Sequence, residues 1–142
     1  MPVKGIGVDV VKVERLVESL ARFGERMEKR LFTEGELEYC RRHKDPLPHL
    51  AARFAAKEAG LKALGTGLRL GIHWRELEVV RERGQAPTLV LHGRSHEISR
   101  QRGGSGMLLA LTHEGDYAMA QALLVGDEIA VPTPRDAAAR AR

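Results

Sequence analysis

Residues 53–67 read Arg53-Phe-Ala-Ala-Lys-Glu-Ala-Gly-Leu-Lys-Ala-Leu-Gly-Thr-Gly67 and form the most informative stretch of the chain. The alanines and leucines favour a helix, and the glycines at the end stop it. Phe54, Glu58, Leu61, Lys62 and Gly65 share one stripe of this helix. From this helix alone, the better interpretation of Glu58 and Lys62 is an ordinary ion pair that stabilises the helix by about 0.3–0.5 kcal/mol. Such pairs normally lie opposite the apolar face, whereas this one interrupts it.

Length and composition predict one domain with a real core. The chain has 142 residues, of which 43% are hydrophobic and only 4% aromatic, so we expect a core of Leu, Val and Ala. The one cysteine, Cys40, excludes an internal disulfide and a multi-cysteine metal site, and we expect it to be a packing residue. No apolar run approaches the ~20 residues that cross a membrane, and the start lacks the apolar segment of a signal peptide. We therefore expect a cytoplasmic protein that does not enter a membrane.

The charge balance predicts an anionic partner. The formal net charge is +4, from 23 Lys and Arg against 19 acidic residues. A surface of this kind attracts a nucleic acid, an acidic protein or a phosphorylated small molecule. Composition does not choose among these three.

Residue patterns outside the central helix predict strands and further helices. Residues rich in Val and Ile indicate the strands, and apolar residues at helical spacing indicate the first helix. Thr33 and Glu36 form a capping box that opens a short helix through about Cys40. A Pro-containing segment, residues 45–48, breaks the chain before the central helix. The expected strands cover residues 3–13, 74–80, 88–91, 107–112 and 117–125, and the other expected helices cover 12–31 and 94–102.

Two polar residues stand out in the expected strands. Asp9 interrupts the first strand, where a buried carboxylate costs several kcal/mol unless it is paired or bound to a metal. At a sheet edge the same carboxylate would face water, so the structural and functional interpretations of Asp9 are balanced. His113 ends a strand directly before the turn at residues 114–116, a position where histidine is more often structural than catalytic.

Three separated motifs find a common explanation in a known family. They are Gly5-Ile-Gly-Val-Asp9-Val, the central stretch at residues 53–67, and Leu111-Thr-His113-Glu. In this order and spacing they resemble the holo-acyl-carrier-protein synthases, which are small 4′-phosphopantetheinyl transferases. The resemblance extends from about residue 3 to residue 125 and implies one transferase domain over residues 1–125. Residues 126–142 lack apolar periodicity, and we expect them to be a disordered tail.

The resemblance implies an activity and a fold. Enzymes of this family transfer the 4′-phosphopantetheine group of coenzyme A to a serine of apo acyl carrier protein, in support of fatty acid biosynthesis. The other product is adenosine 3′,5′-bisphosphate. The implied fold is α+β, with an antiparallel sheet packed against the long central helix, assembled as a homotrimer.

The resemblance also assigns roles to individual residues. Asp9 and Glu58 match the family's Mg²⁺ positions, and two carboxylates with waters and substrate phosphates suit that ion. Lys62, one turn beyond Glu58, is expected to place its ammonium on the phosphates, so Glu58 and Lys62 are the expected catalytic residues. The acceptor of the serine proton stays open between Glu58 and a metal-bound water.

Further positions are assigned to coenzyme A and to the carrier protein. Arg53 and His113 match family positions that contact the phosphates of coenzyme A. Gly65, Thr66 and the turn that ends at Pro87 are expected to approach its nucleotide part. The basic first helix, with Arg15 and Arg22, is expected to dock the acidic carrier protein.

The resemblance further implies that each active site is built from two subunits. Asp9, Glu58 and Lys62 would come from one subunit. His113 and the turn at residues 84–87 would come from the next.

Three other interpretations compete with this one. A nucleic-acid-binding module would explain the basic surface but would leave Asp9 and Glu58 without a role, and the chain offers few aromatic residues for stacking. A metal-dependent phosphohydrolase would need more acidic ligands than this pair. A catalytically inactive scaffold is the third. The sequence does not decide which carrier proteins are accepted, whether acyl-coenzyme A is used, or what residues 126–142 do.

Overall fold

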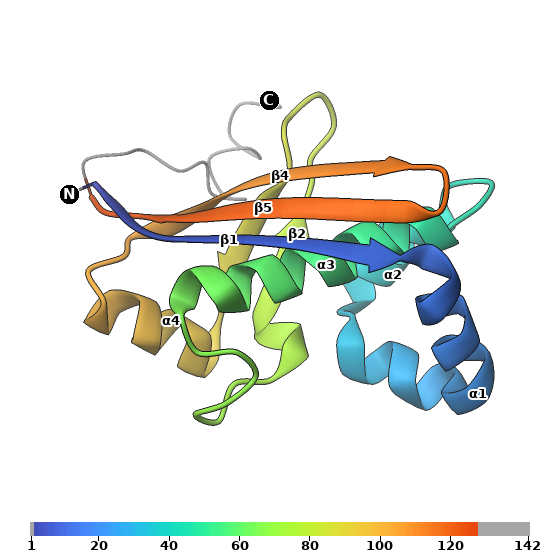
Figure 1. Ribbon diagram of the computed structural model, residues 1–142, viewed down its shortest axis with the longest axis horizontal. Coiled ribbons are helices and arrows are strands. Elements are labelled where there is room, and N and C mark those ends of the chain that lie inside the picture. The colour runs from blue at the N-terminus through green and yellow to red at the C-terminus, as the bar shows by residue number, and fades with distance from the viewer. Residues whose placement is uncertain (1, 128–142) are drawn as a thin grey trace.

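The computed structural model describes residues 2–127 and has the expected α+β architecture, with a sheet on one side and helices on the other (Figure 1). All paired strands of the five-stranded sheet are antiparallel, in the order β1-β5-β4-β3-β2. The strands are β1 (Val3–Lys12), β2 (Leu77–Val80), β3 (Thr88–Leu91), β4 (Gly106–Glu114) and β5 (Tyr117–Val125). The helices are α1 (Val13–Leu31), α2 (Glu34–Arg41), α3 (Leu47–Leu64) and α4 (Gly93–Gln101).

Helix α3 lies directly on the sheet because β1 carries two glycines at the contact. A Cβ atom at Gly5 would lie 2.0 Å from the carbonyl oxygen of Ala63, and one at Gly7 would lie 1.9 Å from that of Ala59. No side chain fits at either position, so the two backbones meet without one between them. This close approach sets the distance between α3 and β1.

Small side chains on both elements complete the core between α3 and the sheet. Ala120 and Ala122 of β5 are fully buried beneath the helix. Helix α3 is buried on nearly every side, which is why its alanines and leucines form no simple amphipathic pattern. The fully buried Cys40 of α2 packs, as expected, in a second apolar cluster formed mainly by α1, α2 and α3. Burial raises the pKa of its thiol to about 11.

A buried ion pair joins α2, α3 and the start of β2. Lys57 Nζ donates to Glu36 Oε1 at 2.7 Å, and both side chains are completely inaccessible to solvent. The same ammonium donates to the carbonyl oxygens of Leu77 at 2.6 Å and Trp74 at 3.2 Å. Glu36 also accepts from the backbone N–H groups of Thr33 and Val79. Because every charge here has several partners, the pair is compatible with full burial.

Several boundaries differ from those expected from the sequence. Residues 74–76 form a 3-10 helix instead of a strand, because the Glu76 carboxylate accepts from the backbone N–H of His73 at 2.6 Å and closes a local turn. Helix α3 already begins within the expected break, since Pro48 falls in the first turn, where a missing N–H costs no hydrogen bond. Helix α1 contains a kink at Gly24, whose φ is +66°.

The far face of the sheet carries apolar side chains that no helix covers in the part of the chain that the structure describes (Figure 1). Exposed residues of this face are Ile6, Val8 and Val10 of β1 with Tyr117 and Met119 of β5. An apolar face of this size on a sheet indicates contact with another molecule.

Within the described residues, no helix is both long enough and apolar enough to span a membrane. The cytoplasmic location stays a prediction of the sequence. The expected disordered tail lies outside the described residues from position 128 onward. Gly126 and Asp127, which that expectation included, are described, and the Gly126 N–H donates to the carbonyl oxygen of Pro2.

Candidate functional site

Asp9, Glu58 and Lys62 meet where α3 crosses β1. Asp9 follows Gly7 by two residues and therefore lies on the same face of β1, toward α3. Glu58 directly precedes Ala59, which contacts Gly7, and Lys62 directly precedes Ala63, which contacts Gly5. The helix period of 3.6 places them one turn apart. The close contact between helix and strand thus brings the three charged groups together.

Lysine 62 bridges the helix and the strand. Lys62 Nζ donates to Asp9 Oδ1 at 3.1 Å and to the Val8 carbonyl oxygen at 3.0 Å. The Asp9 side chain is 17% exposed and that of Lys62 is 53% exposed, so the cluster opens to solvent on the lysine side. The ammonium is thus held at the mouth of the cluster, where it can reach an anion.

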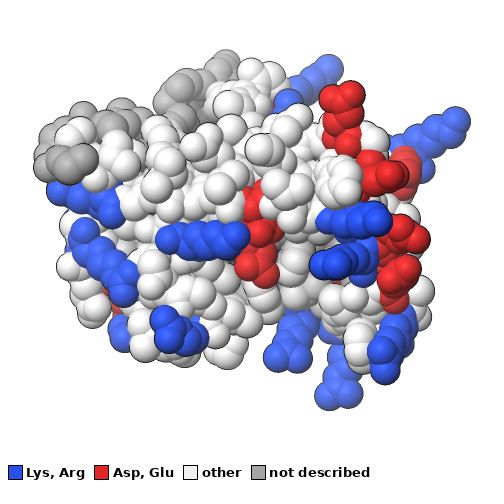
Figure 2. Space-filling view, viewed as in Figure 1, with Lys and Arg blue, Asp and Glu red and all other residues white. Residues whose placement is uncertain are grey.

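The surroundings of Glu58 disfavour the charged form of its carboxyl. Burial, and secondly the charge of Asp9, raise the pKa of the Glu58 carboxyl above its usual value, while Lys62 opposes this shift. One ammonium therefore does not compensate both carboxylates. In the space-filling view, acidic side chains lie in the middle of this face with Lys and Arg around them (Figure 2).

The two carboxylates fit a hard divalent cation that draws its other ligands from elsewhere. No cluster of three or more His, Cys, Asp or Glu side chains with a geometry suited to a metal occurs among residues 2–127. A closed protein cage is therefore not formed within the described chain. Mg²⁺ binds in the required way, through one or two carboxylates together with water and substrate phosphates.

The C-terminal end of α3 leaves backbone accessible near Lys62. Gly65 ends the helix in the left-handed conformation with φ +78°, and its N–H donates to the carbonyl oxygens of Leu61 and Lys62. Thr66 is buried, and its hydroxyl donates to the Gly67 carbonyl oxygen at 2.8 Å. A side chain at position 65 would be strained and would also meet the guanidinium of Arg102.

Arg53 and His113 belong to a second cluster. The Arg53 side chain is nearly buried, with its guanidinium carbon 4.1 Å from the centre of the Tyr39 ring. Arg53 Nη1 donates to the His49 carbonyl oxygen at 3.4 Å, and Arg53 Nε is buried without a hydrogen-bond partner among the described residues. His113 lies against the His49 ring, with 5.2 Å between ring centres. A buried guanidinium with unused donors beside a histidine favours an anionic ligand.

The sheet register separates this second cluster from Asp9. His113 pairs with Ala118 of β5, which in turn pairs with Val11 of β1. His113 therefore lies two strands away from β1 and two register positions beyond Asp9. The turn ending at Pro87 connects β2 and β3, which lie at the edge of the sheet opposite β1. The residues expected at the site thus form separate groups within one chain.

Two adjoining grooves run from Asp9 and Glu58 along α1. The first has a volume of about 310 Å³ and is lined by Asp9, Glu58 and Arg15. The second, about 690 Å³, has Arg22 and Phe23 on its wall. Both are lined by Met27 and Phe54, and Arg15 and Arg22 are both exposed. A basic surface with apolar contacts therefore leads directly to the carboxylates.

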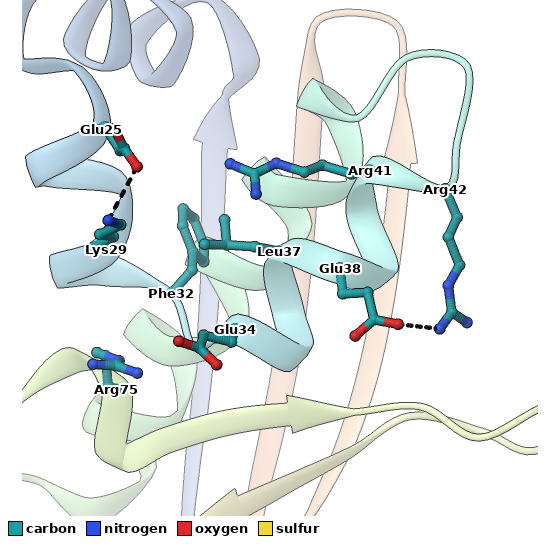
Figure 3. A pocket seen from close by; sticks show the side chains of 9 residues that line it. All are labelled: Glu25, Lys29, Phe32, Glu34, Leu37, Glu38, Arg41, Arg42 and Arg75. Atoms are coloured by element: carbon teal, nitrogen blue, oxygen red, sulfur yellow. Dashed lines mark hydrogen bonds and ion pairs between the residues drawn. The ribbon is translucent and has the colours of Figure 1, made fainter.

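A third pocket, about 600 Å³ in volume between α1 and α2, contains none of the expected site residues (Figure 3). Its wall carries the ion pairs Glu25–Lys29 and Glu38–Arg42, and its floor is formed by Phe32 and Leu37. Glu34, Arg41 and Arg75 also line this pocket.

Some residues of these clusters were missed by sequence reasoning. His43, His49 and Tyr39 surround the expected Arg53 and His113. Their spacing along the chain matches no metal or catalytic pattern, and only the fold brings them to His113. Lys57 was likewise missed, although a lysine between alanines of a buried helix is a signal that it needs a buried acid.

Comparison with known proteins gives a consistent result. Residues 5–122 match the 4′-phosphopantetheinyl transferase superfamily. The chain is 46% identical over 123 residues to the holo-[acyl-carrier-protein] synthase of Syntrophotalea carbinolica, covering 87% of this chain and 96% of that protein. It is 42% identical over 120 residues to the protein of the same name from Koribacter versatilis, covering 84% and 96% of the two chains.

Solved structures of similar proteins share the fold. The holo-[acyl-carrier-protein] synthase of Neisseria meningitidis superposes with a TM-score of 0.77 at 30% identity, covering 86% of this chain and 98% of that one. The Helicobacter pylori enzyme in complex with coenzyme A gives a TM-score of 0.73 at 25% identity, covering 84% and 98% of the two chains.

Proposed function

The chain belongs to the 4′-phosphopantetheinyl transferase superfamily, and we propose that it transfers the 4′-phosphopantetheine group of coenzyme A to a serine of apo acyl carrier protein. The products are holo acyl carrier protein, needed for fatty acid biosynthesis, and adenosine 3′,5′-bisphosphate. The identity to holo-[acyl-carrier-protein] synthases over nearly their whole length carries this conclusion. The cluster of Asp9, Glu58 and Lys62 supplies chemistry suited to it.

The transfer exchanges the phosphoanhydride bond of coenzyme A for a phosphate ester to serine. The serine oxygen forms a bond to the pyrophosphate phosphorus that carries pantetheine, and the bond from that phosphorus to the bridging oxygen breaks. The leaving group departs as adenosine 3′,5′-bisphosphate, and the serine proton passes to a base. Glu58, or a water in contact with it, is the proposed acceptor of that proton.

Asp9 and Glu58 are proposed to hold Mg²⁺, which would neutralise charge on the pyrophosphate when bound. The presence of two carboxylates beside a single ammonium and the open side of the cluster support this proposal. Lys62 keeps its ammonium at the mouth of the cluster and adds positive charge to the phosphates. Gly65, which ends α3 three residues after Lys62 and carries no side chain, and Thr66 are proposed to approach the nucleotide.

Arg53 and His113 are proposed to bind phosphates of coenzyme A, and Pro87 to border its nucleotide, in a site completed by a second subunit. The separation of His113 from Asp9 by two strands within one chain supports this arrangement. A homotrimer forms a closed ring in which every subunit offers both halves to its neighbours. The uncovered apolar face of the sheet, which includes Val8 of β1, offers a surface for this assembly.

The carrier protein is proposed to dock along α1. Arg15 lines the groove that holds Asp9 and Glu58, and Arg22 lines the adjoining apolar groove. An acidic helix placed there would bring its serine to the carboxylates. Complementary charge of this kind mainly speeds the encounter and weakens with salt.

The proposed function is tested by incubating the protein with coenzyme A, Mg²⁺ and a purified apo acyl carrier protein. The carrier should gain the mass of one phosphopantetheine, and adenosine 3′,5′-bisphosphate should appear in equal amount. Asp9→Ala and Glu58→Ala should each nearly abolish the gain while their circular dichroism stays unchanged. Release of inorganic phosphate without any mass gain would instead favour a phosphohydrolase.

A further inference from the structure

Three histidine rings from different segments form a continuous stack. The rings of His43 and His49 are stacked with centres 3.6 Å apart and planes inclined by 25°. The rings of His49 and His113 meet edge to face, with centres 5.2 Å apart and planes inclined by 72°. His43 follows α2, His49 lies in the first turn of α3, and His113 lies near the end of β4. The ring of His49 thus contacts both of the others.

The stack is anchored at its inner end. His43 Nδ1 lies 3.2 Å from the Tyr39 carbonyl oxygen, and the two rings also contact each other with centres 5.1 Å apart. His49 is further fixed through its own carbonyl oxygen, which accepts from Arg53. His113, by contrast, is exposed, and its ring has no hydrogen-bond partner among the described residues. The contact with His49 therefore restrains the ring of His113.

We propose that His49 is a positioning residue: its ring holds that of His113 in the orientation that contacts a phosphate of coenzyme A. This rests on the function proposed above, in which Arg53 and His113 bind those phosphates. His49 itself need not touch the substrate. It transmits the fixed position of α2 and α3 to a side chain on the sheet.

The charges around His49 suit a neutral spacer between cationic groups. Tyr39 and His43 face the stack from α2 and the loop after it, Asp45 from that loop, Arg53 from α3, and His113 from β4. Burial, followed by the charges of His43, His113 and Arg53, lowers the pKa of His49 to about 4, and Asp45 opposes this. At neutral pH the His49 ring is uncharged and can pack against His113 without repelling it.

The test compares two replacements of similar volume. His49→Phe keeps a flat ring that can stack on His43 and contact His113, whereas His49→Leu fills the space without one. With the full-length protein, coenzyme A and apo acyl carrier protein, His49→Leu should raise KM for coenzyme A about tenfold, as expected when a hydrogen bond to a charged group is weakened. Its kcat should change little. His49→Phe should restore KM to near the wild-type value.

A double-mutant cycle shows whether His49 acts through His113. In a His113→Ala background, His49→Leu should cause no further rise in KM, because the ring that it positions is already absent. The matched control is His96→Leu, which removes an exposed histidine of α4 and should leave KM and melting temperature unchanged.

Three results would overturn the proposal. They are an unchanged KM in His49→Leu, an equal rise in KM with and without the His113 side chain, and failure of His49→Phe to restore KM. If the His49→Leu protein does not fold, the comparison of His49→Phe with the wild type still tests the proposal, because the KM of His49→Phe for coenzyme A must match the wild-type value. Absence of transfer by the wild-type protein would instead refute the proposed function itself. That result is distinct from all three above, which require an active wild-type protein.

Discussion

Replacement of Gly7 by alanine tests how the site is built. The added Cβ would lie 1.9 Å from the Ala59 carbonyl oxygen and 2.8 Å from the Ala63 nitrogen, whereas ordinary contacts begin at 3.4 Å. Helix α3 and β1 must then separate by about 1.5 Å, because both clashing atoms belong to backbone. Overpacking of this kind costs about 1–3 kcal/mol, and more where backbone cannot yield. Gly7→Ala should therefore lower the free energy of unfolding by about 3 kcal/mol.

The same displacement should impair transfer in the variant that remains folded. It moves Glu58 and Lys62 on α3 away from Asp9 on β1, and a misplacement of about 1 Å can cost about 100-fold in rate. Urea unfolding followed by circular dichroism gives the stability. Transfer to apo acyl carrier protein, measured below the melting temperature of the variant, gives the rate.

Gly35→Ala is the matched control for Gly7→Ala. The Cβ at Gly35 of α2 would lie 3.6 Å from Glu78 Oε2, an ordinary contact. Alanine is favoured over glycine in a helix by about 1 kcal/mol, so this variant should be as stable as the wild type or more so, with unchanged activity. If Gly7→Ala were as stable and active as Gly35→Ala, the direct contact of α3 with β1 would be refuted.

Three further predictions concern buried and surface charges. Lys57→Ala should lower the free energy of unfolding by about 3–5 kcal/mol, because it leaves the Glu36 carboxylate buried without its partner; a loss below about 1 kcal/mol in urea unfolding would contradict this. Because the pKa of His49 falls from 6.5 unfolded to about 4 folded, stability should be full above pH 6.5 and should decline as the pH falls toward 4. Because solvent screens the partly exposed ring, the loss of unfolding free energy should be on the order of 1 kcal/mol. In His49→Phe this decline with falling pH should be absent. Arg15→Glu combined with Arg22→Glu should raise KM for the carrier far more than KM for coenzyme A, with an effect that fades at high salt; equal rises for both substrates would argue against docking on α1.

Much of the fold follows from local sequence patterns. The capping box at Thr33 and Glu36 forms as expected, with Thr33 Oγ1 accepting from the Glu36 N–H. The expected strands and helices appear, and the boundaries differ where a side chain satisfies the backbone locally, as Glu76 does at residues 74–76. Such a contact involves one carboxylate and one N–H, and the β propensity of Trp74 to Val80 gives no sign of it.

The site was predictable to the extent that its residues share a local spacing. Glu58 and Lys62 are one turn apart on a helix, and Asp9 is marked by its place in an apolar strand. The partner of Lys57 lies 21 residues away on another helix, so no helical pattern identifies it. The histidine stack draws on three segments, and only the tertiary fold brings His113 to His49.

Complementation between two impaired variants tests whether each active site is built from two subunits. Glu58→Ala and His113→Ala proteins, each impaired alone and each with a different tag, are unfolded together and refolded. Mixed rings are then isolated through both tags. Every mixed ring of three contains one interface at which an intact Glu58 faces an intact His113.

The assay is transfer of phosphopantetheine to apo acyl carrier protein by these mixed rings. If the site is shared, activity should return to about one third of the wild-type value, since one of three sites in each ring is complete. Mixed rings that form but remain at the activity of the single variants would show that Glu58 and His113 act within one chain.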